Sequence, residues 1–80
     1  MRFHRVLYGW ELSLPNNEGF FFDDFEEAIT SETTVDDVSE MASTGIDIMC
    51  QDLRLELEFE EYERIHSLMV NAICDHYHIR

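Results

Sequence analysis

The chain contains no lysine and only five arginines, although eighteen of its eighty residues are aspartate or glutamate. Direct binding to nucleic acid or to an anionic membrane needs a positive surface that displaces counterions, so this composition argues against both. A formal net charge of -13 also destabilises a compact state by self-repulsion, and stability alone would favour more interspersed basic residues. The imbalance therefore predicts a cationic partner.

Cysteine, glycine and long apolar runs are scarce as well. Two cysteines are too few for a disulfide framework, no apolar run reaches about 18 residues, and the amino terminus lacks the apolar segment of a signal peptide. These absences predict a reduced, cytoplasmic protein. The three glycines stand singly, and no phosphate-binding loop, nucleophile elbow, H-E-x-x-H or EF-hand spacing occurs, so we expect neither an enzyme nor a cofactor.

Core-forming residues are nevertheless plentiful. The chain is 45% apolar and 12% aromatic, which is too hydrophobic for an acidic disordered tail. Eighty residues allow one domain, and we expect a single acidic domain over 1–80. A chain of this size buries only about 60 to 65% of its unfolded surface, so pairing into a homodimer would help it.

Two stretches have the period of a half-buried strand. Residues 3–14 are rich in β-branched and aromatic side chains, the turn-forming "PNNEG" follows, and "FFF" at 20–22 returns, which predicts a β-hairpin. Leucines alternate with charged residues in "LRLELEF" at 53–59. This alternation favours a third strand, with an extended loop as the alternative.

Three helices are expected between and after these strands. Asp23 or Asp24 can cap a short helix through Ile29. Thr34, with an aspartate three residues later, predicts the start of a helix over 35–44 that Gly45 ends. An apolar stripe with helical spacing then predicts a long C-terminal helix. The stripe consists of Phe59, Tyr62, Ile65, His66, Met69, Ile73 and Tyr77. The fold class is α+β, with a sheet packed with two or three helices.

A metal site is the weaker interpretation of the histidines near the end. Cys74, His76 and His78 form C-x-H-x-H, with His66 two turns earlier. On a helix Cys74 and His78 share a face but His76 points away, and no C-x-x-C pair completes four ligands. We therefore expect no metal, and a metal-responsive regulator stays only as a third hypothesis.

The aromatic residues Trp10 and Phe20, Phe21 and Phe22 favour a buried core, because small domains use large aromatic side chains to gain buried area. If they are exposed instead, they would form a patch that masks a host protein such as RNA polymerase or a toxin. In that alternative, the charge would serve only orientation and solubility.

The negative charge itself favours a functional anionic face. Residues 23–40 hold eight carboxylates and no basic residue. Acids three or four apart on a helix lie about 5 to 6 Å from one another, a spacing comparable to that of nucleic-acid phosphates. The sequence thus predicts an inhibitor that occupies the nucleic-acid site of a basic protein. The candidate contact residues are Asp23, Asp24, Glu26, Glu27, Glu32, Asp36, Asp37, Glu40, Asp47, Asp52, Glu56, Glu58, Glu60 and Glu61.

Residues 36–75 resemble a known family. "DDVSE" precedes "MASTGID" at 41–47, and an acidic stretch with "RI" at 64 and 65 follows. This pattern is similar to the Ocr-type (overcome classical restriction) acidic DNA-mimic antirestriction proteins of phages. The resemblance implies a phage-encoded, dimeric protein of the bacterial host cytoplasm. Its carboxylates would be presented, in place of DNA phosphates, to a restriction enzyme or another DNA-binding complex.

By position, the resemblance carries contact roles to six acids. They are Asp36, Asp37, Asp47, Asp52, Glu58 and Glu60. The first third of the chain departs from the family, because a hairpin is expected where the family is helical. The target therefore stays open among a restriction enzyme, a CRISPR complex and a nuclease.

Overall fold

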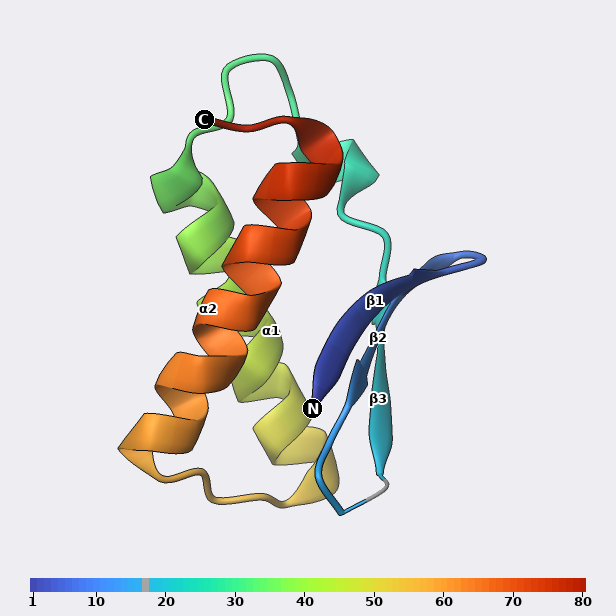
Figure 1. Ribbon diagram of the computed structural model, residues 1–80, viewed down its shortest axis with the longest axis vertical. Helices are drawn as coiled ribbons and strands as arrows, with labels where there is room; N and C mark the ends of the chain where they lie inside the picture. Colours follow the sequence, from blue (N-terminus) through green and yellow to red (C-terminus); the bar gives the residue numbers. More distant parts are fainter. Residues whose placement is uncertain (17) are drawn as a thin grey trace. The chain divides into compact units, whose positions relative to one another are not determined.

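The computed structural model of the chain describes residues 1–16 and 18–80. Within them lie a three-stranded antiparallel sheet, one short 3-10 helix and two α-helices, which is an α+β composition (Figure 1). The chain divides into two compact units, Met1–Glu32 and Thr33–Arg80. The first unit holds the sheet and the second holds both α-helices.

The sheet is a meander in which β2 is central. Strand β1 spans Arg2–Val6, β2 spans Gly9–Ser13 and β3 spans Gly19–Asp23. The prediction of one strand over 3–14 was wrong, because a two-residue turn divides it. Gly9 permits the close approach that follows this turn, since a Cβ there would overlap the backbone oxygen of Phe22.

One face of the sheet is aromatic. The pairs Phe3–Leu12 and Trp10–Phe22 lie on the same side of the pleat, and all four side chains are buried. The Phe3 and Trp10 rings stack with centroids 4.9 Å apart, and Phe22 meets Phe3 edge-on. Trp10 and Phe22 are therefore core residues as predicted, whereas Phe21 on the opposite face is 50% exposed.

The short helix after the sheet is a single 3-10 turn, η1, over Glu26–Ala28. Asp24 Oδ1 accepts a hydrogen bond from the backbone N–H of Glu26 at 2.9 Å, but Phe25 occupies the N-cap position, so the predicted N-cap at Asp23 or Asp24 was wrong and Asp24 acts from one residue outside the turn. The backbone is already extended at Ile29 (φ -97°, ψ 126°), so the predicted helix is limited to this turn.

Helix α1 spans Val35–Leu53 and begins at the capping box that the sequence predicts. The backbone N–H of Asp37 donates to Thr34 Oγ1 at 3.2 Å, and that of Thr34 donates to Asp37 Oδ2 at 2.9 Å. The predicted stop at Gly45 was wrong. Gly45 does not have the positive φ of a terminating glycine, and Ile46 and Met49 continue the buried stripe beyond it.

The predicted strand over 53–59 was also wrong. Helix α1 ends at Arg54, which adopts the left-handed conformation (φ 54°, ψ 45°), and the N–H of Leu55 bonds back to the carbonyl of Cys50. Residues 55–58 then form an extended connection. Its leucines are half-buried and its glutamates exposed, so the alternation is real, but it belongs to no ladder among the described residues.

Helix α2 spans Phe59–Tyr77 and lies antiparallel to α1 (Figure 1). Its buried residues Ile65, Met69 and Ile73 recur every four positions, as do Val38, Ala42 and Ile46 on α1. Phe59 differs from the expected stripe, since it is 74% exposed. It occupies the first position of the helix, where no full turn precedes it.

None of the helices in the described part of the chain combines the length and apolarity that crossing a membrane requires.

Candidate anionic interface

The predicted contact acids are almost all accessible. Thirteen of the fourteen are exposed, and Asp24 is half-buried. They differ in what surrounds them, because some have hydrogen-bonding roles within the fold and others have none. Among the described residues, the ion pair with an arginine is confined to the first unit, where Asp24 forms it, whereas the hydrogen-bonded acids Asp37, Glu58 and Glu61 of the second unit serve as helix caps.

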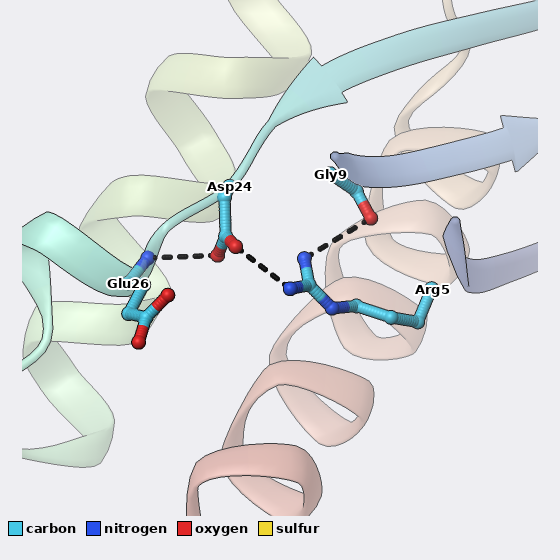
Figure 2. A network of polar contacts seen from close by, with 4 residues as sticks. All are labelled: Arg5, Gly9, Asp24 and Glu26. Atoms are coloured by element: carbon cyan, nitrogen blue, oxygen red, sulfur yellow. Dashed lines mark hydrogen bonds and ion pairs between the residues drawn. The ribbon is translucent and has the colours of Figure 1, made fainter. Parts of the chain in front are cut away.

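In the unit Met1–Glu32, the half-buried acid is neutralised. Arg5 Nη2 donates to Asp24 Oδ2 at 2.7 Å, and Arg5 Nη1 donates to the carbonyl of Gly9 at 3.2 Å (Figure 2). The guanidinium carbon also lies 5.7 Å from the centroid of the Trp10 ring. Asp24 is therefore a structural residue that joins the sheet to η1, and it is a poor candidate for contact with a partner.

In the unit Thr33–Arg80, α1 carries a stripe of free acids. Asp36, Glu40 and Asp47 are four and seven residues apart, so they lie on one face, opposite the buried residues. The rise along the axis is about 6 Å for the first step and about 10 Å for the second. Asp37 lies beside this stripe but is engaged in the capping box. We call Asp36, Glu40 and Asp47 the α1 stripe.

A second group of acids gathers where α1 passes into α2. The side chains of Glu58 and Glu61 form the capping box of α2, in which Glu61 Oε1 accepts the N–H of Glu58 at 3.5 Å. Asp52, Glu56 and Glu60 have no hydrogen bond or ion pair within the described residues. Glu63 extends the group by one turn, and beyond it α2 carries only Asp75. We call the predicted acids of this group the junction cluster. It comprises Asp52, Glu56, Glu58, Glu60 and Glu61.

Cations do not compensate these two groups. The same unit holds Arg54, Arg64 and Arg80, all exposed, and across the described residues none of the three forms an ion pair with a carboxylate. Glu26, Glu27 and Glu32 belong to the other unit. The acids of the second unit thus form an anionic surface with almost no internal neutralisation.

A groove of about 450 Å³ between α1 and α2 was not predicted from the sequence. Ser39 and Ser43 line it from α1, and α2 contributes the remaining lining residues, which are Phe59, Tyr62, Glu63, His66 and Ser67. No sequence signal marked this groove, because Phe59 was expected within the apolar stripe and its 74% exposure becomes visible only once α1 and α2 are paired.

His66 fixes the geometry of this groove. Its Nε2 lies 3.0 Å from the carbonyl oxygen of Ser39 and 3.1 Å from Ser39 Oγ. A carbonyl oxygen only accepts, so Nε2 carries the proton and donates to it. A nitrogen that donates cannot remove the Ser39 hydroxyl proton, so this pair does not have the arrangement of a nucleophile and its base.

The proposed metal ligands are not brought together. Cys74 and His78 line a groove of about 570 Å³ at the end of α2, but among residues 1–16 and 18–80 no three metal-binding side chains are grouped to hold an ion. Burial raises the pKa of the Cys74 thiol. Burial, and secondarily the charge of Asp47, also raise the pKa of Cys50, so neither thiol is activated.

Compared with known protein families, curated proteins and solved structures, the chain matches none. The resemblance over residues 36–75 therefore stays an expectation.

Proposed function

We propose that the protein is a phage-encoded acidic DNA mimic, which occupies the nucleic-acid-binding site of a host defence or DNA-processing protein. Restriction enzymes, CRISPR complexes and nucleases are the target classes. The observation that carries the proposal is the uncompensated anionic surface of the unit Thr33–Arg80, where eleven carboxylates face three unpaired arginines.

The spacing of the α1 stripe suits this role. DNA-binding proteins meet a charge every 1.7 Å of duplex axis with rows of lysine and arginine, and much of their affinity comes from those contacts. Carboxylates held on a helix at intervals of about 6 to 10 Å can engage part of such a row. Because the helix is already formed, little ordering entropy opposes binding, and the fixed charge speeds encounter with a basic channel.

The stripe and the junction cluster are the acids best suited to contact. Their carboxylates are exposed, and apart from Glu58 and Glu61 none has an internal hydrogen bond among the described residues. Asp24 and Asp37 are less suited, because the fold already uses their oxygens. Binding to either of these would compete with an internal contact.

Capture followed by nucleic-acid elution tests the proposal. The immobilised chain is exposed to a bacterial lysate at low salt, and the bound proteins are eluted with a 30-base-pair duplex. We expect duplex DNA to release the captured protein, since the two ligands share one site. A triple variant, Asp36→Asn with Glu40→Gln and Asp47→Asn, is expected to capture at least about tenfold less, because three charge contacts are lost.

A matched triple variant in the other unit provides the control. Asp23→Asn with Glu26→Gln and Glu27→Gln removes the same charge from exposed positions. If the α1 stripe contacts the partner, the α1 triple variant should capture less protein than this control variant. Captured protein that resists duplex DNA while remaining sensitive to salt would contradict DNA mimicry.

A second candidate function is the masking of a host protein through apolar contacts. Its support is the exposure of Leu7, Tyr8 and Phe21, at 81%, 78% and 50%. Trp10 and Phe22 no longer belong to this patch, since both are buried. Substitution of Leu7 and Tyr8 by serine would then abolish capture, whereas the acidic triple variant would only slow it.

A further inference from the structure

The groove between α1 and α2 places exposed aromatic rings beside a carboxylate. Phe59 is 74% exposed at its lip, and Tyr62 and Glu63 line it on the same helix. Glu63 lies four residues after Phe59, so the carboxylate and the phenyl ring are neighbours on the helix surface. No lysine or arginine is among the lining residues.

The aromatic wall of the groove is held in place. The Tyr62 and His66 rings stack with centroids 6.0 Å apart and an interplanar angle of 11°. His66 is in turn fixed to α1 by its hydrogen bond to the Ser39 carbonyl. The groove therefore offers a rigid ring face, an exposed second ring and a nearby negative charge.

This set of groups suits a guanidinium. Arginine stacks its planar head on aromatic rings and pairs with a carboxylate in a fixed fork, whereas the lysine ammonium is a compact, strongly hydrated point charge. The surrounding junction cluster makes the partner cationic by charge complementarity. A neutral peptide or an anionic ligand would be repelled or would leave Glu63 desolvated without a partner.

In the unit Met1–Glu32, an aromatic ring and a carboxylate are also neighbours, and there an arginine of the chain itself contacts both. The Arg5 guanidinium carbon lies 5.7 Å from the Trp10 ring centroid. Arg5 Nη2 lies 2.7 Å from Asp24 Oδ2 (Figure 2). An aromatic ring and an acid there bind an arginine of the chain itself. In the helical unit the ring and the acid are present, but the lining holds no arginine.

We propose that this groove is a receptor for an arginine side chain of the basic partner, which inserts against Phe59 and Tyr62 and pairs with Glu63. The proposal rests on the proposed function and deepens it, because it identifies a contact that depends on more than charge. It also predicts that an arginine, rather than a lysine, of the partner's nucleic-acid site contributes most to binding.

Two peptide probes of equal charge test the groove directly. Fluorescent hexa-arginine and hexa-lysine are titrated with the chain, and their dissociation constants are compared by anisotropy. We expect hexa-arginine to bind about three- to tenfold tighter than hexa-lysine. Phe59→Leu and Glu63→Gln should each reduce that ratio to about one to twofold, and the ring signals of Tyr62 and His66 should shift in NMR spectra on addition of hexa-arginine.

Two matched variants separate the groove from general charge. Phe21→Leu alters an exposed aromatic residue of the other unit, and Glu60→Gln removes an exposed acid next to the groove but outside its lining. Both should keep the wild-type ratio. Far-ultraviolet circular dichroism should be unchanged in all four variants, since each side chain is exposed.

Three outcomes would overturn the proposal. One is an equal affinity for the two peptides, and another is a ratio that Phe59→Leu leaves intact. A third is a dimer by sedimentation that Phe59→Leu converts to a monomer, because a second copy of the chain would then fill the groove. If the peptides bind equally but duplex DNA still elutes the captured protein, the proposal of DNA mimicry stands and the arginine groove is rejected. If hexa-arginine binds tighter but duplex DNA does not elute the captured protein, the groove stands and DNA mimicry is rejected.

Discussion

The two units of this chain treat their negative charge in opposite ways. In the unit Met1–Glu32, seven carboxylates share two arginines, and Arg5 is bound between a tryptophan ring and Asp24. In the unit Thr33–Arg80, eleven carboxylates share three arginines, none of them ion-paired within the described residues. The contrast teaches that the arginines of the helical unit do little to neutralise its acids, so that its charge stays available to a partner.

The helical unit can tolerate this charge because its stability has other sources. Seven of the core residues lie on its two helices, and the capping box at Thr34 satisfies the first backbone donors of α1. Acids in the first turns of both helices also interact favourably with the helix dipoles. The outward faces are thus free to carry carboxylates at little structural cost.

The largest expected effect is on that apolar core. Ile46→Ala should lower the free energy of unfolding by about 2 to 5 kcal/mol, because the side chain is fully buried. Ile48→Ala, at a neighbouring position that is 50% exposed, should cost well under about 1 kcal/mol. Urea denaturation followed by circular dichroism measures both. Equal losses would mean that the buried stripe does not stabilise the unit.

The next largest effect concerns the arginines, because Arg5 has internal contacts and Arg64 has no ion pair among the described residues. Arg5→Ala should destabilise the chain by about 1 to 2 kcal/mol, since it removes a ring contact, a partly exposed ion pair and a hydrogen bond to Gly9. Arg64→Ala should change stability by only a few tenths of a kcal/mol, roughly the value of a surface charge. The same urea titration provides the measurement. A larger loss at Arg64 would show that the helical unit is neutralised after all.

A smaller effect, of opposite sign, concerns the α1 stripe. Glu40→Gln combined with Asp47→Asn should raise the free energy of unfolding by roughly 0.5 kcal/mol, because like charges on one helix face repel. The gain should vanish in 1 M salt, where the screening length is about 3 Å. Asp24→Asn is the contrasting variant and should destabilise at both salt concentrations. Destabilisation by the stripe variant would indicate that these acids have internal partners.

The smallest effect is on thiol reactivity. Burial and Asp47 raise the pKa of Cys50, so its iodoacetamide reaction should reach half its maximal rate at a higher pH in the folded chain than in urea. The raised pKa contributes stability below the pKa of the unfolded thiol, and that contribution is lost as pH rises through the folded value. Asp47→Asn should move the midpoint down. An unchanged midpoint in that variant would separate Cys50 from the α1 stripe.

The local signals in the sequence predicted beginnings better than ends. Thr34 and Asp37 specify a capping box from four residues, and the structure has it. Gly45 was predicted to end the helix, but Ile46 and Met49 continue the buried face beyond it. Their burial offsets the cost of a glycine inside the helix. The helix ends instead at Arg54, which adopts the left-handed conformation. Arginine has no preference for this conformation, so the sequence did not indicate the end of the helix.

Alternation over 53–59 was misleading for a physical reason. A half-buried extended connection and a half-buried strand expose every second side chain alike, and only a partner strand distinguishes them. The groove at Phe59 could not be predicted either, because it depends on how α1 and α2 are paired around Ser39 and His66. Exposure of most of the acids, in contrast, could be expected from the sequence, because charged side chains are rarely buried without a partner, and Asp24, which pairs with Arg5, is the half-buried one among the predicted contacts.

The most direct test of the central claim is a displacement titration on the captured protein. Fluorescent duplex DNA is bound to that protein, and the unlabelled chain is added at 50 mM and at 200 mM salt. If the carboxylates of the helical unit occupy the nucleic-acid site, the anisotropy should fall to that of free DNA, and the chain should be much less potent at the higher salt. An anisotropy that stays high or rises, with the chain and DNA bound together, would contradict the account.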